Sequence, residues 1–197
     1  MEESREKSHE GKTDEELINL ILKDQDNFLY LTDRYEDKLL NYIRKISGAG
    51  REEAEDILQE VFLKVYLNLH SFNPKLKFSS WIYRITHNQV ITNFRRNRSR
   101  PEQIFLDEDN EFLSNIASEI NLNTEIDQKI LKKNLDKILA KMDLKYREVL
   151  ILRFLEEKDY NEISDILKKP QGSVSSLINR AKKQFLNKSK EDQSKFY

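Results

Sequence analysis

One stretch of the chain carries positive charges without any acid, and such charges neutralise the phosphates of nucleic acids. Residues 75–100 contain no Asp or Glu but seven cations: Lys75, Lys77, Arg84, Arg95, Arg96, Arg98 and Arg100. Neutralising phosphates drives a salt-dependent association. Aromatic side chains in the same stretch can stack on unpaired bases. The stretch therefore predicts a nucleic-acid interface with these candidate residues: Phe78, Trp81, Tyr83, Arg84, His87, Asn88, Arg95 and Arg96.

Simpler explanations apply to parts of this stretch. Cations interact favourably with the dipole at the end of a helix, and this alone explains Arg95 and Arg96. Phe78 and Trp81 also suit a hydrophobic core, and for Phe78 the two interpretations are evenly supported. Neither explanation accounts for seven cations without one interspersed acid. The net charge of the whole chain, −1, conceals this stretch because a run of acids follows it between residues 102 and 127.

A second candidate interface follows from two short amphipathic helices expected over residues 161–167 and 172–186. The turn between them, residues 168–171, contains Pro170. The apolar stripe of the second helix consists of Val174, Leu177, Ile178, Ala181 and Phe185. A helix-turn-helix presents the polar side of its second helix to the major groove, and the free N–H groups at a helix start favour phosphate. The outward candidates are Ser173, Ser175, Ser176, Asn179, Arg180 and Lys183.

The alternative for this pair is an ordinary helical hairpin with a solvated polar face. The sequence favours the helix-turn-helix instead, through Tyr160, Glu162 and Ile163 and the Pro-x-Gly-Ser-Val turn at residues 170–174.

A third polar face lies opposite the apolar stripe of the helix expected over residues 54–69. It consists of Asp56, Gln59, Glu60 and Leu63. Acidic helix faces are usually only solvated, so this face alone indicates no function.

Residues that could carry out catalysis are scattered. His9, His70 and His87 lack metal-ligand spacing, and the chain has no Cys. No Gly-rich phosphate loop or nucleophile motif is present in the sequence. We therefore expect no enzyme activity, no catalytic residue, no metal and no cofactor. No apolar run approaches the roughly 20 residues that span a bilayer, which predicts a cytoplasmic protein without membrane insertion.

Apolar periodicity predicts an all-α fold of two small helical bundle domains joined by an acidic linker. Four helices are expected in the first domain, residues 13–98. The first begins at a capping box formed by Thr13 and Glu16, and the second covers residues 27–47 and ends at Gly48. The third covers residues 54–69, and the fourth covers residues 81–96 with Ser79 or Ser80 as its cap. The linker, residues 99–125, lacks periodicity. The second domain, residues 126–188, is expected to contain helices over 126–142, 146–154 and the two described above.

Three strings, in this order and spacing, resemble the sigma-70 family of RNA polymerase sigma factors, and specifically its extracytoplasmic-function branch. They are DILQEVF at 56–62, FSSWIYRI at 78–85 and YNEISDILKKPQGSVSSLINRAK at 160–182. The resemblance implies a promoter-specificity subunit of bacterial RNA polymerase. Residues 13–98 would be a sigma-2-like domain that binds core polymerase and the promoter −10 element. Residues 126–188 would be a sigma-4-like helix-turn-helix domain that binds the −35 element.

The resemblance also implies roles for the polar faces. Asp56, Gln59, Glu60 and Leu63 would dock on the coiled coil of the polymerase β′ subunit, while the second domain would meet the β flap. Asn88 would read a base flipped out of the non-template strand, and the candidates around it would contact −10 DNA. The outward residues of the last helix would contact −35 DNA. The acidic linker would thread toward the polymerase cleft, and an anti-sigma factor is an expected partner.

Two departures from the family pattern concern the recognition helix and its brace. Ser175 and Leu177 stand where the family often carries Arg, and Ser164 stands where a small Ala is usual. The alternatives are a conventional helix-turn-helix repressor or activator, and a polymerase-binding antagonist that has lost promoter binding. Promoter-specific initiation that requires core polymerase would distinguish the main interpretation from both. The sequence leaves open whether the two domains pack against each other.

Overall fold

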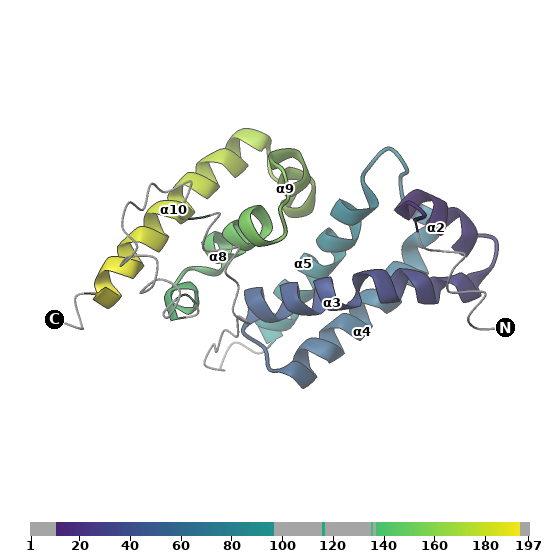
Figure 1. Cartoon of the computed structure of the whole chain (residues 1–197), viewed down its shortest axis with the longest axis horizontal. Coiled ribbons are helices and arrows are strands. Elements are labelled where there is room, and N and C mark those ends of the chain that lie inside the picture. Colours follow the sequence, from purple (N-terminus) through teal and green to yellow (C-terminus); the bar gives the residue numbers. More distant parts are fainter. Residues whose placement is uncertain (1–10, 97–115, 117–134, 136, 194–197) are drawn as a thin grey trace.

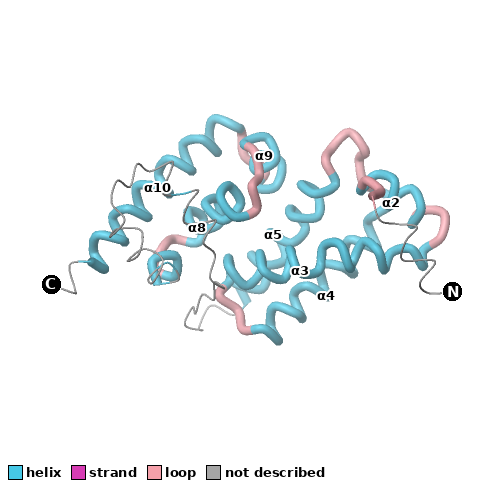
Figure 2. The backbone as a smooth tube through the Cα atoms, viewed as in Figure 1, coloured by secondary structure: helices cyan, strands magenta, loops and turns pink. Residues whose placement is uncertain are grey.

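The computed structural model describes residues 11–96, 116, 135 and 137–193, and this part of the chain is helical and contains no strand (Figure 1). Figure 2 shows these helices joined by short loops. The first domain contains α2 (Asp14–Ile21), η1 (Gln25–Asn27), α3 (Phe28–Ser47), α4 (Arg51–Asn68), η2 (Leu69–Ser71) and α5 (Phe78–Arg96). The second contains α8 (Leu144–Leu150), the π-helical turn η3 (Ile151–Leu155), α9 (Tyr160–Leu167) and α10 (Gln171–Gln193).

Local signals in the sequence explain where several helices begin and end. The predicted capping box of α2 is confirmed: Thr13 Oγ1 accepts from the Glu16 amide at 3.2 Å, and Glu16 Oε2 accepts from the Thr13 amide at 2.8 Å. Asp159 and Glu162 cap α9 in the same reciprocal way. Helix α3 ends, as predicted, at Gly48, whose φ of 69° lies in the left-handed region that glycine adopts without strain.

Two predicted boundaries were wrong. Helix α5 begins at Phe78 rather than Trp81, so neither Ser79 nor Ser80 caps it, and the Trp81 amide already donates to the Lys77 carbonyl at 3.2 Å. Burial of Phe78 (1% exposed) draws this residue into the first turn. Helix α10 continues past Leu186 to Gln193, supported by a Lys188–Glu191 ion pair at 3.0 Å. The linker at 99–125, apart from Ile116, and most of the helix expected over 126–142 lie outside the described residues.

The first domain is built on the packing of α3, α4 and α5 around interlocking apolar stripes. Helix α3 contributes buried residues including Leu31, Leu39 and Ile43, and α4 contributes Ala54 and Val61. An aromatic cluster ties the start of α5 to α3 through ring centroids 5.3–5.7 Å apart: Tyr35, Phe72, Phe78 and Trp81. Edge-to-face pairs of this kind contribute about 0.5–1.5 kcal/mol each beyond the burial of their surface. The cluster therefore fixes the position of α5.

The second domain packs α8 and α9 against α10. The apolar stripes predicted for the last two helices are buried except for Leu177: Ile163, Ile166 and Leu167 on α9, and Val174, Ile178, Ala181 and Phe185 on α10, which contacts α9. Lys168 adopts a left-handed conformation (φ 52°) at the end of α9, which allows the sharp turn into α10. Ser164, where the family usually has Ala, donates from Oγ to the Lys169 carbonyl at 2.6 Å. This substitution is compatible with the helix-turn-helix.

The two domains lie side by side. Helix α9 packs along α5, and α8 reaches α3, so that α5 lies between α4 on one side and the second domain on the other (Figures 1 and 2). The packing brings together residues about a hundred positions apart in the sequence, such as Tyr42 and Glu148. The domains therefore share an interface that the sequence did not predict.

Candidate nucleic-acid interface

The acidic face of α4 is solvent-exposed. Asp56, Gln59, Glu60 and Leu63 occupy positions that share one side of a helix, and all four are exposed. Glu60 accepts a hydrogen bond from the side chain of Gln89 on α5, and Gln89 in turn accepts one from Lys64. The face is thus tied to α5 from behind while its outer surface stays free for a partner.

One apolar side chain that was not predicted as part of this face, Leu67, extends it beyond Leu63. Leu63 is 58% exposed, and Leu67, one turn further along, is 66% exposed. Tyr66 is also partly exposed and donates from its hydroxyl to Gln25 Oε1 at 2.6 Å. Leu63 and Leu67, one turn apart, form a small exposed apolar strip beside the acids of this face. The spacing of Leu67 from Leu63, outside the buried stripe, was the signal available in the sequence.

The cationic side of α5 is only partly exposed. Asn88, Arg95 and Arg96 are exposed, whereas Arg84 and His87 are half-buried. Arg84, Asn88 and Arg95 lie at steps of four and seven residues and therefore share one side of the helix. Arg98 and Arg100 lie outside the described residues. The structure thus brings the predicted base-reading amide and two of the predicted phosphate contacts onto one accessible surface.

The predicted stacking aromatics occupy the interior. Phe78 and Tyr83 are 1% exposed and Trp81 is 7% exposed, which matches the core interpretation of Phe78 and Trp81. The Tyr83 hydroxyl donates a hydrogen bond to Glu156 of the second domain, and the Lys158 ammonium lies 4.6 Å from the centroid of the Tyr83 ring. Burial and the neighbouring Glu156 raise the pKa of Tyr83 well above its usual range. In this arrangement the three rings are covered, and their stacking on bases stays a prediction.

The polar side of α10 matches its predicted exposure closely. Ser173, Ser176, Asn179, Arg180 and Lys183 are exposed, and Ser175 is half-buried. Val174, Ile178, Ala181 and Phe185 are fully buried, while Leu177 is only half-buried. The start of α10 therefore offers hydroxyl, amide and cationic groups on a helix held rigidly by α8 and α9.

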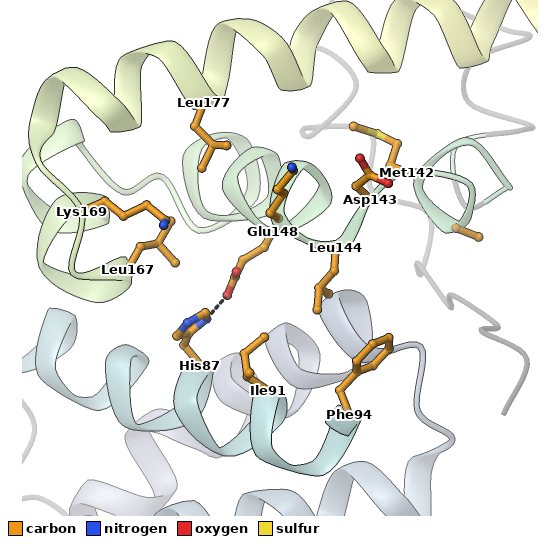
Figure 3. Close-up of a pocket in the computed structure, with 12 residues that line it drawn as sticks. His87, Ile91, Phe94, Met142, Asp143, Leu144, Glu148, Leu167, Lys169 and Leu177 are labelled. Carbon is orange, nitrogen blue, oxygen red and sulfur yellow. Dashed lines mark hydrogen bonds and ion pairs between the residues drawn. The ribbon is translucent and has the colours of Figure 1, made fainter. Parts of the chain in front are cut away.

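A buried polar cluster joins the domains, and it was not predicted. Glu148 of α8 is 3% exposed, and its Oε1 accepts a hydrogen bond from the Tyr42 hydroxyl of α3 at 2.8 Å. The same oxygen contacts His87 Nδ1 of α5 (Figure 3). Burial and the Glu148 carboxylate raise the pKa of Tyr42 far above its usual range. Beside this cluster, the fully buried Arg147 donates from Nη2 to the Ile46 carbonyl at 2.7 Å.

Other contacts between the domains lie nearer to the solvent. The Lys77 ammonium, just before α5, lies 3.4 Å from Glu162 Oε1 and 3.9 Å from Asp159 Oδ2 at the start of α9. An open groove of about 840 Å³ lies between the domains and is lined by His87, Ile91 and Phe94 of α5 on one side (Figure 3). The opposite wall consists of second-domain residues, including Leu144, Leu167 and Leu177.

These features define a class: a two-domain helical protein with a helix-turn-helix domain, a helix with exposed cations at its end, and an exposed acidic face on α4. Comparison with known proteins identifies the family. The model of Sigma-70 region 2 matches residues 31–100, and that of Sigma-70 region 4 matches residues 132–185. No helix in the described part of the chain combines the length and apolar character needed to cross a membrane.

Relatives along most of the chain agree with the family models. The ECF RNA polymerase sigma factor SigW of Bacillus subtilis is 34% identical over 175 residues, covering 81% of this chain and 87% of the relative. The sigma-E factor of Escherichia coli K12 is 29% identical over 187 residues, covering 91% and 95%. The solved structure of CnrH, in complex with the cytosolic domain of CnrY, has the same fold with a TM-score of 0.64 at 20% identity, covering 89% and 96%. The chain belongs to the extracytoplasmic-function branch of the sigma-70 family.

Proposed function

We propose that this chain binds core RNA polymerase through the exposed face of α4 and recognises promoters through α5 and α10. The observation that carries the proposal is the exposure of polar side chains on α4, on α10 and, in part, on α5, the helices where the family resemblance requires them. The chain would perform no bond-making step itself, since the polymerase supplies the chemistry. Its work would be binding, and it would take place in the cytoplasm, where the polymerase acts.

The docking step would use the α4 face. Asp56 and Glu60 suit a basic partner, and the exposed Leu63 and Leu67 add apolar surface that gains from burial. The coiled coil of the β′ subunit is the partner that the family resemblance implies, and the β flap would receive the second domain. Because Glu60 is held by Gln89, docking on α4 would also restrain α5.

Recognition of the −10 element would use the outer side of α5. Asn88 offers a donor and an acceptor on one amide, which suits the edge of an unpaired base. Arg84, Arg95 and Arg96 would contact phosphates, and His87 would join them when it is released from Glu148. Phe78, Trp81 and Tyr83 contribute as the core that positions α5, and they would stack on bases only after becoming exposed.

Recognition of the −35 element would use the start of α10. Ser173, Ser175 and Ser176 lie at the beginning of the helix, with Asn179, Arg180 and Lys183 following along the same side. Hydroxyl and amide groups can read base edges in the major groove, and the two cations would hold the flanking backbone. An anti-sigma factor is a further proposed partner, supported by the solved complex of the similar protein CnrH with the cytosolic domain of CnrY.

The test is run-off transcription with purified core polymerase on fragmented genomic DNA, comparing wild type with Gln59→Ala and Asn88→Ala. Wild type should create new start sites. Gln59→Ala should weaken core binding about tenfold, equivalent to about 1.4 kcal/mol. Asn88→Ala should leave core binding intact and reduce open complexes about tenfold, as expected for the loss of a bidentate base contact.

Each other outcome has a defined meaning. A wild-type protein that binds core polymerase but starts no transcript would contradict promoter recognition and favour an antagonist, which the absence of cations at Ser175 and Leu177 would then explain. No core binding by wild type would contradict the central proposal and leave a helical DNA-binding protein.

A further inference from the structure

We propose that α10 crosses the major groove of the −35 element between two pairs of cations, each of which holds one phosphate strand. The turn pair, Lys168 and Lys169, lies in the turn before α10, and the helix pair, Arg180 and Lys183, lies on α10 itself. The inference rests on the proposed role of α10 in −35 recognition. It adds to that role two DNA-binding residues that lie outside the recognition helix.

A long stretch of the chain without acids surrounds the turn into α10. Residues 166–190 contain no Asp or Glu but seven cations: Lys168, Lys169, Arg180, Lys182, Lys183, Lys188 and Lys190. Two of the seven are engaged within their own domain. The Lys182 ammonium lies 5.5 Å from the centroid of the Phe154 ring, and Lys188 pairs with Glu191 at 3.0 Å. The other five cations are exposed and form no ion pair with a described residue, so they can meet an external anion.

The turn pair and the helix pair lie on either side of a neutral segment. Residues 171–179, the first nine of α10, carry no charge. A helix rises 1.5 Å per residue, so this segment is about 13 Å long. The major groove of B-DNA is about 12 Å wide. A helix that crosses the groove therefore places the neutral segment against the base edges and each pair of cations near one of the two phosphate strands.

The start of α10 depends on the turn for positive charge. Arg180 and Lys183 lie about 13 and 18 Å along the helix axis from Gln171. A phosphate strand next to the start of α10 is therefore out of their reach. Lys169 lies two residues before Gln171 and Lys168 three, which places their Cα atoms within about 7 and 11 Å of it even for an extended chain. Between residues 168 and 179 only the turn pair is charged.

The backbone of Lys168 supports a role for its side chain. Lys168 ends α9 with φ 52° and ψ 46°, in the left-handed region that disfavours residues other than glycine. Strain that is retained at an exposed residue indicates a use for the side chain. The alternative is that Lys168 only compensates the dipole at the end of α9. That alternative predicts an effect on stability but none on DNA binding.

The turn holds both lysines on a fixed backbone. The Lys169 amide donates to the Ser164 carbonyl at 3.2 Å, and the Lys169 carbonyl accepts from Ser164 Oγ at 2.6 Å. The Pro170 carbonyl accepts from the amides of Ser173 and Val174 at 2.8 and 3.1 Å. Lys169 borders the open groove between the domains, and its side chain is exposed there. The turn is thus tied to both helices, and its cations can meet phosphates without a rearrangement of the backbone.

The salt dependence of DNA binding tests the turn pair. Holoenzyme is assembled from core polymerase and the full chain, and fluorescence anisotropy measures its binding over a series of KCl concentrations. The DNA is a duplex that contains the −35 element of a promoter from the run-off experiment and ends before the −10 element. Each phosphate contact contributes about 0.9 to the slope of log K against log salt concentration. Lys169→Gln should therefore lower the slope by about 0.9 and weaken binding about eightfold at about 0.1 M salt.

The matched control is Lys190→Gln, which makes the same change at an exposed position about two turns beyond Lys183. It should leave the slope and the affinity unchanged. Phosphate contacts carry no sequence information, so Lys169→Gln should weaken binding to a duplex with a scrambled −35 element by the same factor. Asn179→Ala, in contrast, should reduce the preference for the intact element without changing the slope.

The same measurements contain the results that would overturn the proposal. These are an unchanged slope in Lys169→Gln, an equal loss in Lys190→Gln, or a loss of core binding in Lys169→Gln, which would turn the pair toward the polymerase instead. Wild-type holoenzyme that binds the intact and scrambled duplexes equally would instead contradict the proposed −35 recognition itself.

Two variants of Lys168 separate a DNA contact from a structural role. Glycine adopts the left-handed conformation without strain, so Lys168→Gly should raise the midpoint of thermal unfolding by about 2 °C. The same variant should lower the slope by about 0.9, whereas Lys168→Arg keeps the cation and should keep the wild-type slope. An unchanged slope in Lys168→Gly would overturn the role of Lys168 in DNA binding, whatever the change in stability.

Discussion

In the described part of the chain, Tyr35, Tyr42 and Tyr83 hold their hydroxyl groups against carboxylates, and two of these contacts join the domains. Tyr35 donates to Asp14 of α2, Tyr42 to Glu148 of α8, and Tyr83 to Glu156 beside η3. In each case burial is the largest cause that raises the pKa of the phenol, and the neighbouring carboxylate raises it further. The fold therefore requires all three phenols to remain neutral.

This requirement predicts the behaviour of the protein in alkaline solution. An unfolded tyrosine ionises near pH 10. Because the pKa values of Tyr35, Tyr42 and Tyr83 are raised in the folded state, their contribution to stability is fully present below about pH 10 and is lost as the pH rises further. Tyrosinate absorbance in the near ultraviolet, followed together with circular dichroism, should show these three of the eight tyrosines ionising only as helicity is lost.

The variant Tyr83→Phe provides the control for this titration. It should remove about one third of the absorbance change that accompanies unfolding and leave the earlier change unaltered. Ionisation of all tyrosines in one step, with helicity unchanged, would show that the phenols are not held in buried contacts.

At the scale of the elements, the turn after α3 and the start of α10 place opposite demands on glycine. Gly48 has a φ of 69°, where any side chain is strained, while a side chain at Gly172 would lie in open space within α10. Gly48→Ala should lower the free energy of unfolding by about 1–2 kcal/mol. Gly172→Ala should raise it by about 0.5–1 kcal/mol, because glycine disfavours a helix. Thermal unfolding followed by circular dichroism measures both. Unchanged or higher stability in Gly48→Ala would contradict the assigned role of Gly48, and a loss of stability in Gly172→Ala would contradict the prediction for Gly172.

The elements were largely predictable because their signals are local. Apolar stripes located α3, α4, α9 and α10, while Thr13 with Glu16 and the glycine after Ser47 marked helix boundaries. The start of α5 was missed because the serines at positions 79 and 80 imitate a cap. What decides that boundary is burial of Phe78 against Tyr35 and Phe72, which are distant in sequence or lie across a loop. Tertiary packing here overrides a local preference.

At the scale of the whole molecule, the predicted surfaces on α4 and α10 required only helical periodicity, and their exposure follows the sequence. The packing of the two domains against each other could not be predicted in this way, because in the sequence a carboxylate such as Glu148 looks like any other charge on a short helix. The structural role of Glu148 depends on its contacts with Tyr42 and His87, which lie 106 and 61 residues away in the sequence. The covering of Tyr83 could not be predicted for the same reason: its partner Glu156 lies in the other domain.

The shared use of Glu148 also limits how this protein can be recombined. Tyr42, His87 and Glu148 form one hydrogen-bonded unit assembled from two domains. A chimaera that took its helix-turn-helix domain from another sigma factor, with an apolar residue in place of Glu148, would leave the Tyr42 hydroxyl buried without its acceptor or force the domains apart. The halves of this chain are therefore matched parts rather than interchangeable modules.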